Sequence, residues 1–203
     1  STELCARIAE AWEDRRRDVA GASGPEEVAT ALERLFSALR RLDEPWAAST
    51  SGRPGATELH DLASLGVRLL TELAGCARTG GMEREAVATE ALTVPFCVLM
   101  ARQGAELSAL EPVVNALAAL ANTLSDPADL AQLFGLMGEI QSAVSPAIAV
   151  DTDRTEPQRP WRVLLLNRAI VATRSHRPAL MTIAFDAIVE HLPEEAARFF
   201  EEG

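Results

Sequence analysis

The feature that most constrains this chain is the recurrence of helical pairs from Ser23 to Glu202. Three of the pairs open near Thr57, Ser108 and Pro160, so the openings lie 51 and 52 residues apart. A helical hairpin cannot bury its apolar face alone, so hairpins that recur at a steady interval are typical of a stack. With leucine stripes and helix-start signals throughout, the pattern predicts an all-α fold, a right-handed α–α superhelix of about nine helices.

Segments rich in proline, glycine and polar residues suggest how the chain is organised. Residues 43–56 contain two prolines and two glycines and predict a surface linker. This linker would separate an N-terminal helical hairpin, 1–45, from a helical domain, 57–203, although 1–203 can also form one continuous domain. A second polar segment, 146–160, predicts a long mobile connection.

Prolines and N-cap residues predict where individual helices begin or break. Asp126 and Pro127 together predict a helix start, and Pro178 and Pro193 predict two more. Pro95 lies inside an otherwise helical segment. Because proline has no backbone donor and clashes with the preceding turn, that helix is expected to kink or split.

Composition excludes several classes of function. A net charge of −11 argues against general nucleic-acid binding and against docking on anionic membranes. All 19 basic residues are arginine, so a P-loop of the usual kind and Schiff-base or pyridoxal chemistry are excluded. Arginine in place of lysine is typical of a GC-rich, bacterial-like composition.

The expected location follows from hydropathy and from the cysteines. No apolar stretch approaches the ~20 residues of a membrane span. The three cysteines, Cys5, Cys76 and Cys97, lack C-x-x-C spacing, so a cytoplasmic, reducing location is expected.

One helical pair, 108–142, resembles an armadillo/HEAT-type repeat. The resemblance rests on the alanine- and leucine-rich run Val113–Asn122 and, for two further pairs, on spacing alone. It implies an α–α superhelix used as a binding scaffold. In armadillo proteins, helix asparagines line the inner groove and hold the backbone of an extended peptide, and by resemblance three asparagines could do so here: Asn115, Asn122 and Asn167. The alternatives are an interhelical hydrogen bond or plain solvent exposure.

A second candidate site is the arginine-rich segment 154–177, whose six arginines face one acid, Glu156. Arginine suits forked recognition of carboxylate or phosphate. Four residues on one helix and its following turn could therefore form an anion pocket: Asn167, Arg168, Arg174 and His176. Alternatively, the arginines neutralise the six acids of residues 178–203. We expect this internal role for Arg177 and the groove role for Arg168.

No catalytic or metal-binding set stands out. The three histidines, His60, His176 and His191, lack the spacing of a zinc or di-iron site, so no metal or cofactor is expected. His60 could act as a general base only with partners brought from elsewhere in the chain. Cys97, beside Phe96, is expected to be a core residue and not a nucleophile.

These observations predict a non-enzymatic scaffold that binds a peptide or protein partner in a helical groove. The arginine-rich segment would suit an acidic partner. The alternative is a small-molecule or anion-binding regulatory domain. An open groove would favour the scaffold, and a closed apolar cavity with the arginines inside would favour the regulatory domain. Self-association into a homo-oligomer is also expected, because Phe199 and Phe200 have nothing after them in this sequence to bury them.

Overall fold

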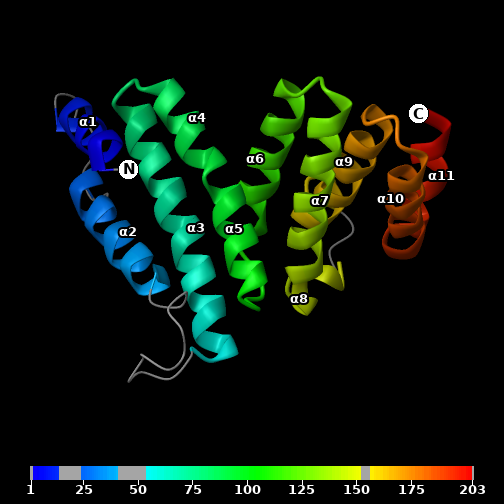
Figure 1. The fold of residues 1–203 in the computed structure, drawn as a ribbon, viewed down its shortest axis with the longest axis horizontal. Helices are drawn as coiled ribbons and strands as arrows, with labels where there is room; N and C mark the ends of the chain where they lie inside the picture. Colours follow the sequence, from blue (N-terminus) through cyan, green and yellow to red (C-terminus); the bar gives the residue numbers. More distant parts are fainter. Residues whose placement is uncertain (1, 14–23, 41–53, 152–155, 203) are drawn as a thin grey trace. The chain divides into compact units, whose positions relative to one another are not determined.

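The protein is all-helical, as predicted (Figure 1). The computed structural model describes residues 2–13, 24–40, 54–151 and 156–202, and this part of the chain contains no β-strand. It contains eleven helical segments where about nine were expected, because one predicted helix is split and a four-residue helix was not foreseen. They are α1 (Thr2–Glu13), α2 (Pro25–Arg40), α3 (Ala56–Thr79), α4 (Glu83–Ala91), α5 (Thr93–Arg102), α6 (Leu110–Thr123), α7 (Pro127–Ala143), α8 (Pro146–Ala149), α9 (Pro160–Arg174), α10 (Pro178–His191) and α11 (Pro193–Glu202).

The predicted helix starts are confirmed. Asp126 is the N-cap of α7, and its carboxylate accepts a hydrogen bond from the Ala128 amide at 2.6 Å. Helices α10 and α11 begin at their prolines, whose missing N–H costs nothing in a first turn. The split at Pro95 is also confirmed, because α4 ends at Ala91 and α5 begins at Thr93.

Contacts divide the chain into two compact units, residues 1–113 and 114–203, which we call the first unit and the second unit. Helix α6 crosses this division. The linker predicted at 43–56 lies largely outside the described residues. Of the helices described, none is both long and apolar enough to cross a lipid bilayer.

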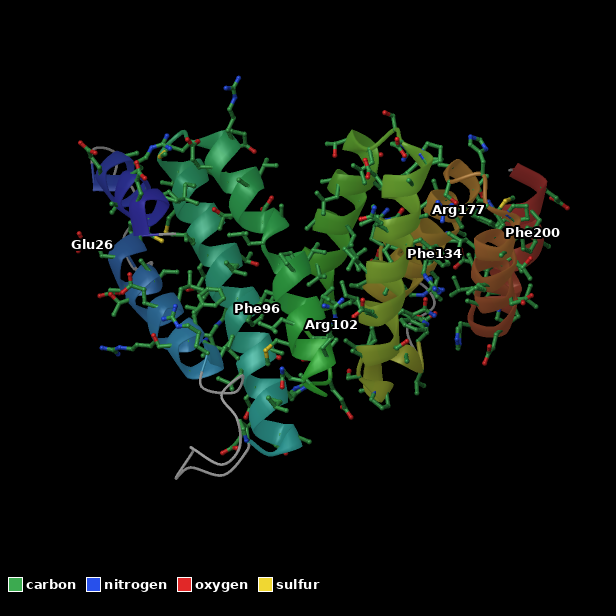
Figure 2. The ribbon with its side chains drawn as sticks, in the orientation of Figure 1. Glu26, Phe96, Arg102, Phe134, Arg177 and Phe200 are labelled. Atoms are coloured by element: carbon green, nitrogen blue, oxygen red, sulfur yellow. The ribbon has the colours of Figure 1, made fainter. Side chains whose placement is uncertain are left out.

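In the first unit, α3 packs against α1, α2, α4 and α5. Phe96 of α5 fills the centre of this packing and is 4% exposed (Figure 2). Its ring lies directly over Gly66 of α3, where a Cβ atom would come within 2.1 Å of Phe96 Cζ. Phe36 of α2 meets the same ring edge-on, with centroids 6.2 Å apart. One aromatic side chain therefore joins three helices.

In the second unit, α9 packs against both α7 and α10, and α10 packs against α11. Met137 and Ile140 of α7 and Leu164 of α9 are completely buried. Phe185 of α10 contacts Phe199 and Phe200 of α11, with ring centroids 6.1 and 5.2 Å away. This cluster partly buries the two terminal phenylalanines, and Phe200 remains 44% exposed.

Candidate functional site

Two arginines of the predicted segment serve internal ion pairs. Arg159 is buried, and its Nε donates to both carboxylate oxygens of the buried Asp151, at 2.7 and 2.9 Å. Its Nη2 donates to Glu195 of α11 at 2.9 Å, and Arg162 Nε binds the other oxygen of Glu195. This cluster fastens α11 to the start of α9.

The same cluster involves residues of the segment 146–160, which was expected to be a mobile polar connection. The segment begins with α8, and its described residues Asp151 and Arg159 form an ion pair, whereas 152–155 lie outside the described residues. The Asp151 backbone has φ of 51°, in the left-handed region that aspartate tolerates better than most residues. Buried charges persist in proteins when they are paired in this way. The sequence alone gave no sign that these two charges meet.

Arg174 caps a helix. Its Nη1 and Nη2 donate to the carbonyl oxygens of Ala121 and Leu124, at 2.7 and 2.5 Å. These carbonyls lie at the C-terminal end of α6, where helix geometry leaves acceptors unused and the helix dipole favours a cation. Both terminal nitrogens of Arg174 therefore already donate hydrogen bonds to backbone carbonyls of the protein.

Arg168 is in a different situation from the other arginines of the segment. It lies on the face of α9 that packs against α7, with Cζ 4.1 Å from the ring centroid of Phe134. Its Nη1 donates to Gln141 Oε1 at 2.8 Å, while its buried Nε has no hydrogen-bond partner. Its Nη2 occupies a notch over Gly138, 2.9 Å from where a Cβ atom would lie.

No carboxylate pairs with the Arg168 guanidinium among the residues that the structure describes. Burial without a counter-ion lowers the pKa of the Arg168 side chain from its usual value. The ring of Phe134 offsets part of the cost through a cation–π contact, but the Nε donor stays unsatisfied. The Arg168 guanidinium therefore carries a positive charge that no carboxylate of the described residues balances.

The remaining predicted residues do not converge on Arg168. Asn115 and Asn122 are exposed on α6, and Asn167 is half-buried on α9. His176 is exposed in the turn after α9, with φ of 53°. Arg177, expected to neutralise acids of the next helix, is exposed and makes no ion pair in the described part of the chain. The predicted four-residue anion pocket is thus not assembled, since Arg174 caps α6 and Arg168 packs on α7.

Sequence reasoning missed a polar cluster in the first unit. His60 of α3 lies beside Ser108 and beside the Glu106 carbonyl, which belong to the connection between α5 and α6. Ser64, one turn after His60, contacts the Ser108 hydroxyl at 3.0 Å. His60 and Ser108 are 48 residues apart in sequence, so no local motif could have signalled their contact.

Three other features are candidate sites: the Cys97 thiol, possible metal ligands and a groove between α1 and α2. Cys97 is buried, as predicted, and burial raises the pKa of its thiol to about 12, so it stays protonated at neutral pH. Among the described residues, no three histidine, cysteine, aspartate or glutamate side chains are grouped as metal ligands. An open groove of about 530 Å³ between α1 and α2 is lined by three glutamates and small side chains: Cys5, Ala6, Ala9, Glu10, Glu26, Ala29, Thr30 and Glu33.

Comparison with known proteins assigns the chain to no family. No family model matches the sequence, and neither a curated protein nor a solved structure matches it.

Proposed function

We propose that this protein is a non-enzymatic scaffold that binds a peptide or protein partner in a groove of a right-handed α–α superhelix of armadillo/HEAT type. The all-helical fold and the regular interval between helical pairs support this architecture. The observation that carries the proposal is the half-buried Arg168 guanidinium, whose buried Nε has no hydrogen-bond partner and whose charge has no carboxylate partner in the described chain. An acidic side chain of the partner would supply the missing negative charge.

The surroundings of Arg168 suit a partner that approaches between α7 and α9. Gly138 has no side chain to block the guanidinium. The side-chain amide of Asn167, the residue before Arg168, forms no hydrogen bond with the residues that the structure describes. An amide of this kind can bind the backbone of an extended peptide, which needs one donor and one acceptor.

Asn115 and Asn122 extend this arrangement along α6. Arg174 joins the last turn of α9 to the last turn of α6, and both helices run in the same direction (Figure 1). Asn122 adjoins Ala121 at that contact, and Asn115 lies two turns before it, just as Asn167 lies two turns before Arg174. The three amides would then meet successive residues of one bound strand.

A small-molecule or anion-binding regulatory domain is the second candidate, because the Arg168 guanidinium would also bind a free anion. The peptide scaffold and the anion-binding domain differ in the further groups that each requires around Arg168. A small-anion pocket requires several groups to converge, whereas Arg174 and His176 lie away from Arg168 or are already engaged. We therefore place the peptide scaffold first.

An array of immobilised hexapeptides, with and without acidic residues, tests the proposal. The wild-type chain is expected to bind a subset enriched in Asp and Glu, with affinity that falls as salt rises. Arg168→Gln should weaken this binding at least tenfold, a loss of about 1.4 kcal/mol. The matched control is Arg177→Gln, an exposed arginine without an ion pair, which should bind as the wild type does.

Two outcomes would contradict the scaffold. Equal binding by the wild type and Arg168→Gln would remove Arg168 from the site. Saturable binding of inorganic phosphate or acetate that depends on Arg168, with no peptide selected from the array, would favour the regulatory anion-binding domain. Circular dichroism and urea unfolding of each variant separate a lost contact from a lost fold.

A further inference from the structure

The polar cluster of the first unit forms a hydrogen-bonded chain in which the Glu106 carbonyl assigns one donor. A carbonyl oxygen can only accept, so His60 Nδ1 must donate to the Glu106 carbonyl at 3.0 Å. In the tautomer with its proton on Nδ1, the imidazole presents its Nε2 lone pair to Ser108 Oγ, 3.4 Å away. The Ser108 hydroxyl donates to that nitrogen, and its oxygen accepts from the Ser64 hydroxyl at 3.0 Å.

We propose that Ser108 is an activated nucleophile, with His60 as its general base, that accepts acyl groups from small neutral carboxylic esters and transfers them to water. This activity lies in the first unit, and the partner binding proposed above uses residues of the second unit; if both hold, the non-enzymatic role applies to the second unit alone. A serine hydroxyl is weakly nucleophilic by itself and becomes reactive when an adjacent base takes its proton. The base in turn needs a third group that fixes its tautomer and orientation.

The Glu106 carbonyl supplies that third group. In hydrolases with a catalytic triad a carboxylate has this role, and a wrong imidazole tautomer is enough to abolish most of the activity. Here a main-chain acceptor holds the productive tautomer, with the proton on Nδ1. The distance of 3.4 Å from Ser108 Oγ to Nε2 is long, as is common for catalytic hydrogen bonds before substrate binds.

The step conserves atoms and charge. Ser108 Oγ attacks the ester carbonyl carbon while its proton passes to His60 Nε2, and a tetrahedral oxyanion forms. The C–O bond to the alcohol then breaks, and the imidazolium returns the proton to the leaving oxygen. Water, deprotonated by His60, attacks the acyl carbon of the acyl-serine. The bond from that carbon to Ser108 Oγ then breaks, the imidazolium returns the proton to Oγ, and the carboxylic acid is released.

Nearby groups favour this sequence and restrict the substrate. The Ser64 hydroxyl donates to Ser108 Oγ, which stabilises negative charge on that oxygen. The first turn of α6 contributes little to an oxyanion site, because the Leu110 N–H donates to the Ser108 carbonyl at 2.9 Å and Pro112 has no N–H. The acidic residues Asp61 and Glu106 adjoin the cluster in sequence, so neutral or cationic esters would approach more readily than anionic ones.

Exposure of the cluster suits a small substrate. His60, Ser64 and Ser108 are all half-buried, so the hydroxyl and the imidazole can be reached from solvent while their positions are held by neighbouring elements. Short acyl chains are expected to suit such a half-buried site better than long ones, which need a deep cavity to bind. A modest turnover of activated esters is therefore expected.

The test uses the full chain, a fluorophosphonate probe that labels activated serines, and p-nitrophenyl acetate as substrate. Peptide mapping by mass spectrometry should find the probe on Ser108. Ser142 is the matched reference, since it is exposed and its hydroxyl donates only to the Gly138 carbonyl. We expect His60→Gln to slow labelling and ester hydrolysis by about 100-fold, the lower range for loss of a general base. Ser64→Ala should have a smaller effect.

Labelling of Ser108 at the rate of Ser142, or labelling unchanged in a folded His60→Gln variant, would overturn the proposal. A second measurement covers the case in which His60→Gln does not fold. In Ser108→Cys, with His60 intact, iodoacetamide at neutral pH should alkylate residue 108 at least tenfold faster than it alkylates Ser142→Cys, because an adjacent base raises the thiolate fraction. Equal rates would show that His60 does not activate this position.

Discussion

Each unit contains a helix glycine over which a long side chain from another helix packs, and the two side chains differ in kind. In the first unit the ring of Phe96 lies over Gly66, and in the second unit the guanidinium of Arg168 lies over Gly138. Both glycines permit an approach that a Cβ atom would obstruct. The same local device therefore accommodates an apolar side chain in one unit and a charged side chain in the other.

The difference separates a stabilising contact from a functional one. Phe96 is buried, and its apolar ring gives up no hydrogen bond or charge hydration there, so its contact with Gly66 stabilises the fold and has no other role. Arg168 brings a charge and a donor that the described chain does not satisfy, and such groups destabilise a folded protein. Such a loss of folding stability is expected at a side chain whose role is to bind a partner.

The largest effect is expected for Gly66→Ala. The new Cβ atom would lie 2.1 Å from Phe96 Cζ, and Phe36 packs on the same ring, so the ring has little space to move. Overpacking of a core costs up to about 3 kcal/mol, and we expect a loss near that value in the free energy of unfolding. Urea denaturation followed by circular dichroism measures it.

Gly75→Ala on the same helix is the control. No atom lies within 4 Å of its added Cβ, and alanine favours a helix over glycine by about 0.5–1 kcal/mol. This variant should be more stable than the wild type. A Gly66→Ala variant as stable as Gly75→Ala would show that Phe96 does not occupy the notch.

Local sequence signals predicted most of the fold, because helix starts depend on residues within a few positions of one another. Asp126–Pro127, Pro178 and Pro193 begin helices as expected, and Pro95 divides one. Long-range contacts were not predictable in this way. In the segment 146–160, the short helix α8 and the Asp151–Arg159 ion pair were not foreseen, because composition does not reveal which charges meet.

The candidate sites depend on residues far apart in sequence, and they were predicted less well. Sequence identified Arg168 as distinct from its neighbours but gave no sign of Phe134 or Gly138 beneath it. It placed Arg174 beside Arg168 in a pocket, whereas carbonyls about fifty residues away bind Arg174. Tertiary packing selects such partners, and helical periodicity fixes only which face of a helix carries each residue.

The second prediction compares Gly138→Ala with Gly135→Ala on α7. The Cβ added at Gly135 meets nothing within 4 Å, so this variant should gain about 0.5–1 kcal/mol from helix propensity. The Cβ added at Gly138 would displace Arg168 Nη2, the far end of a flexible side chain, at a small cost. Gly138→Ala should therefore gain less than Gly135→Ala in urea unfolding. Equal gains would mean that the guanidinium does not rest in this notch.

The smallest effect is expected for Arg168→Lys, measured by urea unfolding between pH 8 and pH 10.5. Burial lowers the pKa at this position in the folded state, while the unfolded lysine keeps its usual value near 10.4. In that window the unfolded state binds more protons, so the free energy of unfolding should rise with pH. The chain has no other lysine and no tyrosine, and its cysteines titrate equally in the exposed control, Arg177→Lys. Parallel pH profiles for the two variants would contradict the idea that the Arg168 position buries a charge without a counter-ion. A rise in the free energy of unfolding that is confined to Arg168→Lys would show that burying this charge destabilises the second unit. The Phe96–Gly66 contact of the first unit buries no charge and has no such effect.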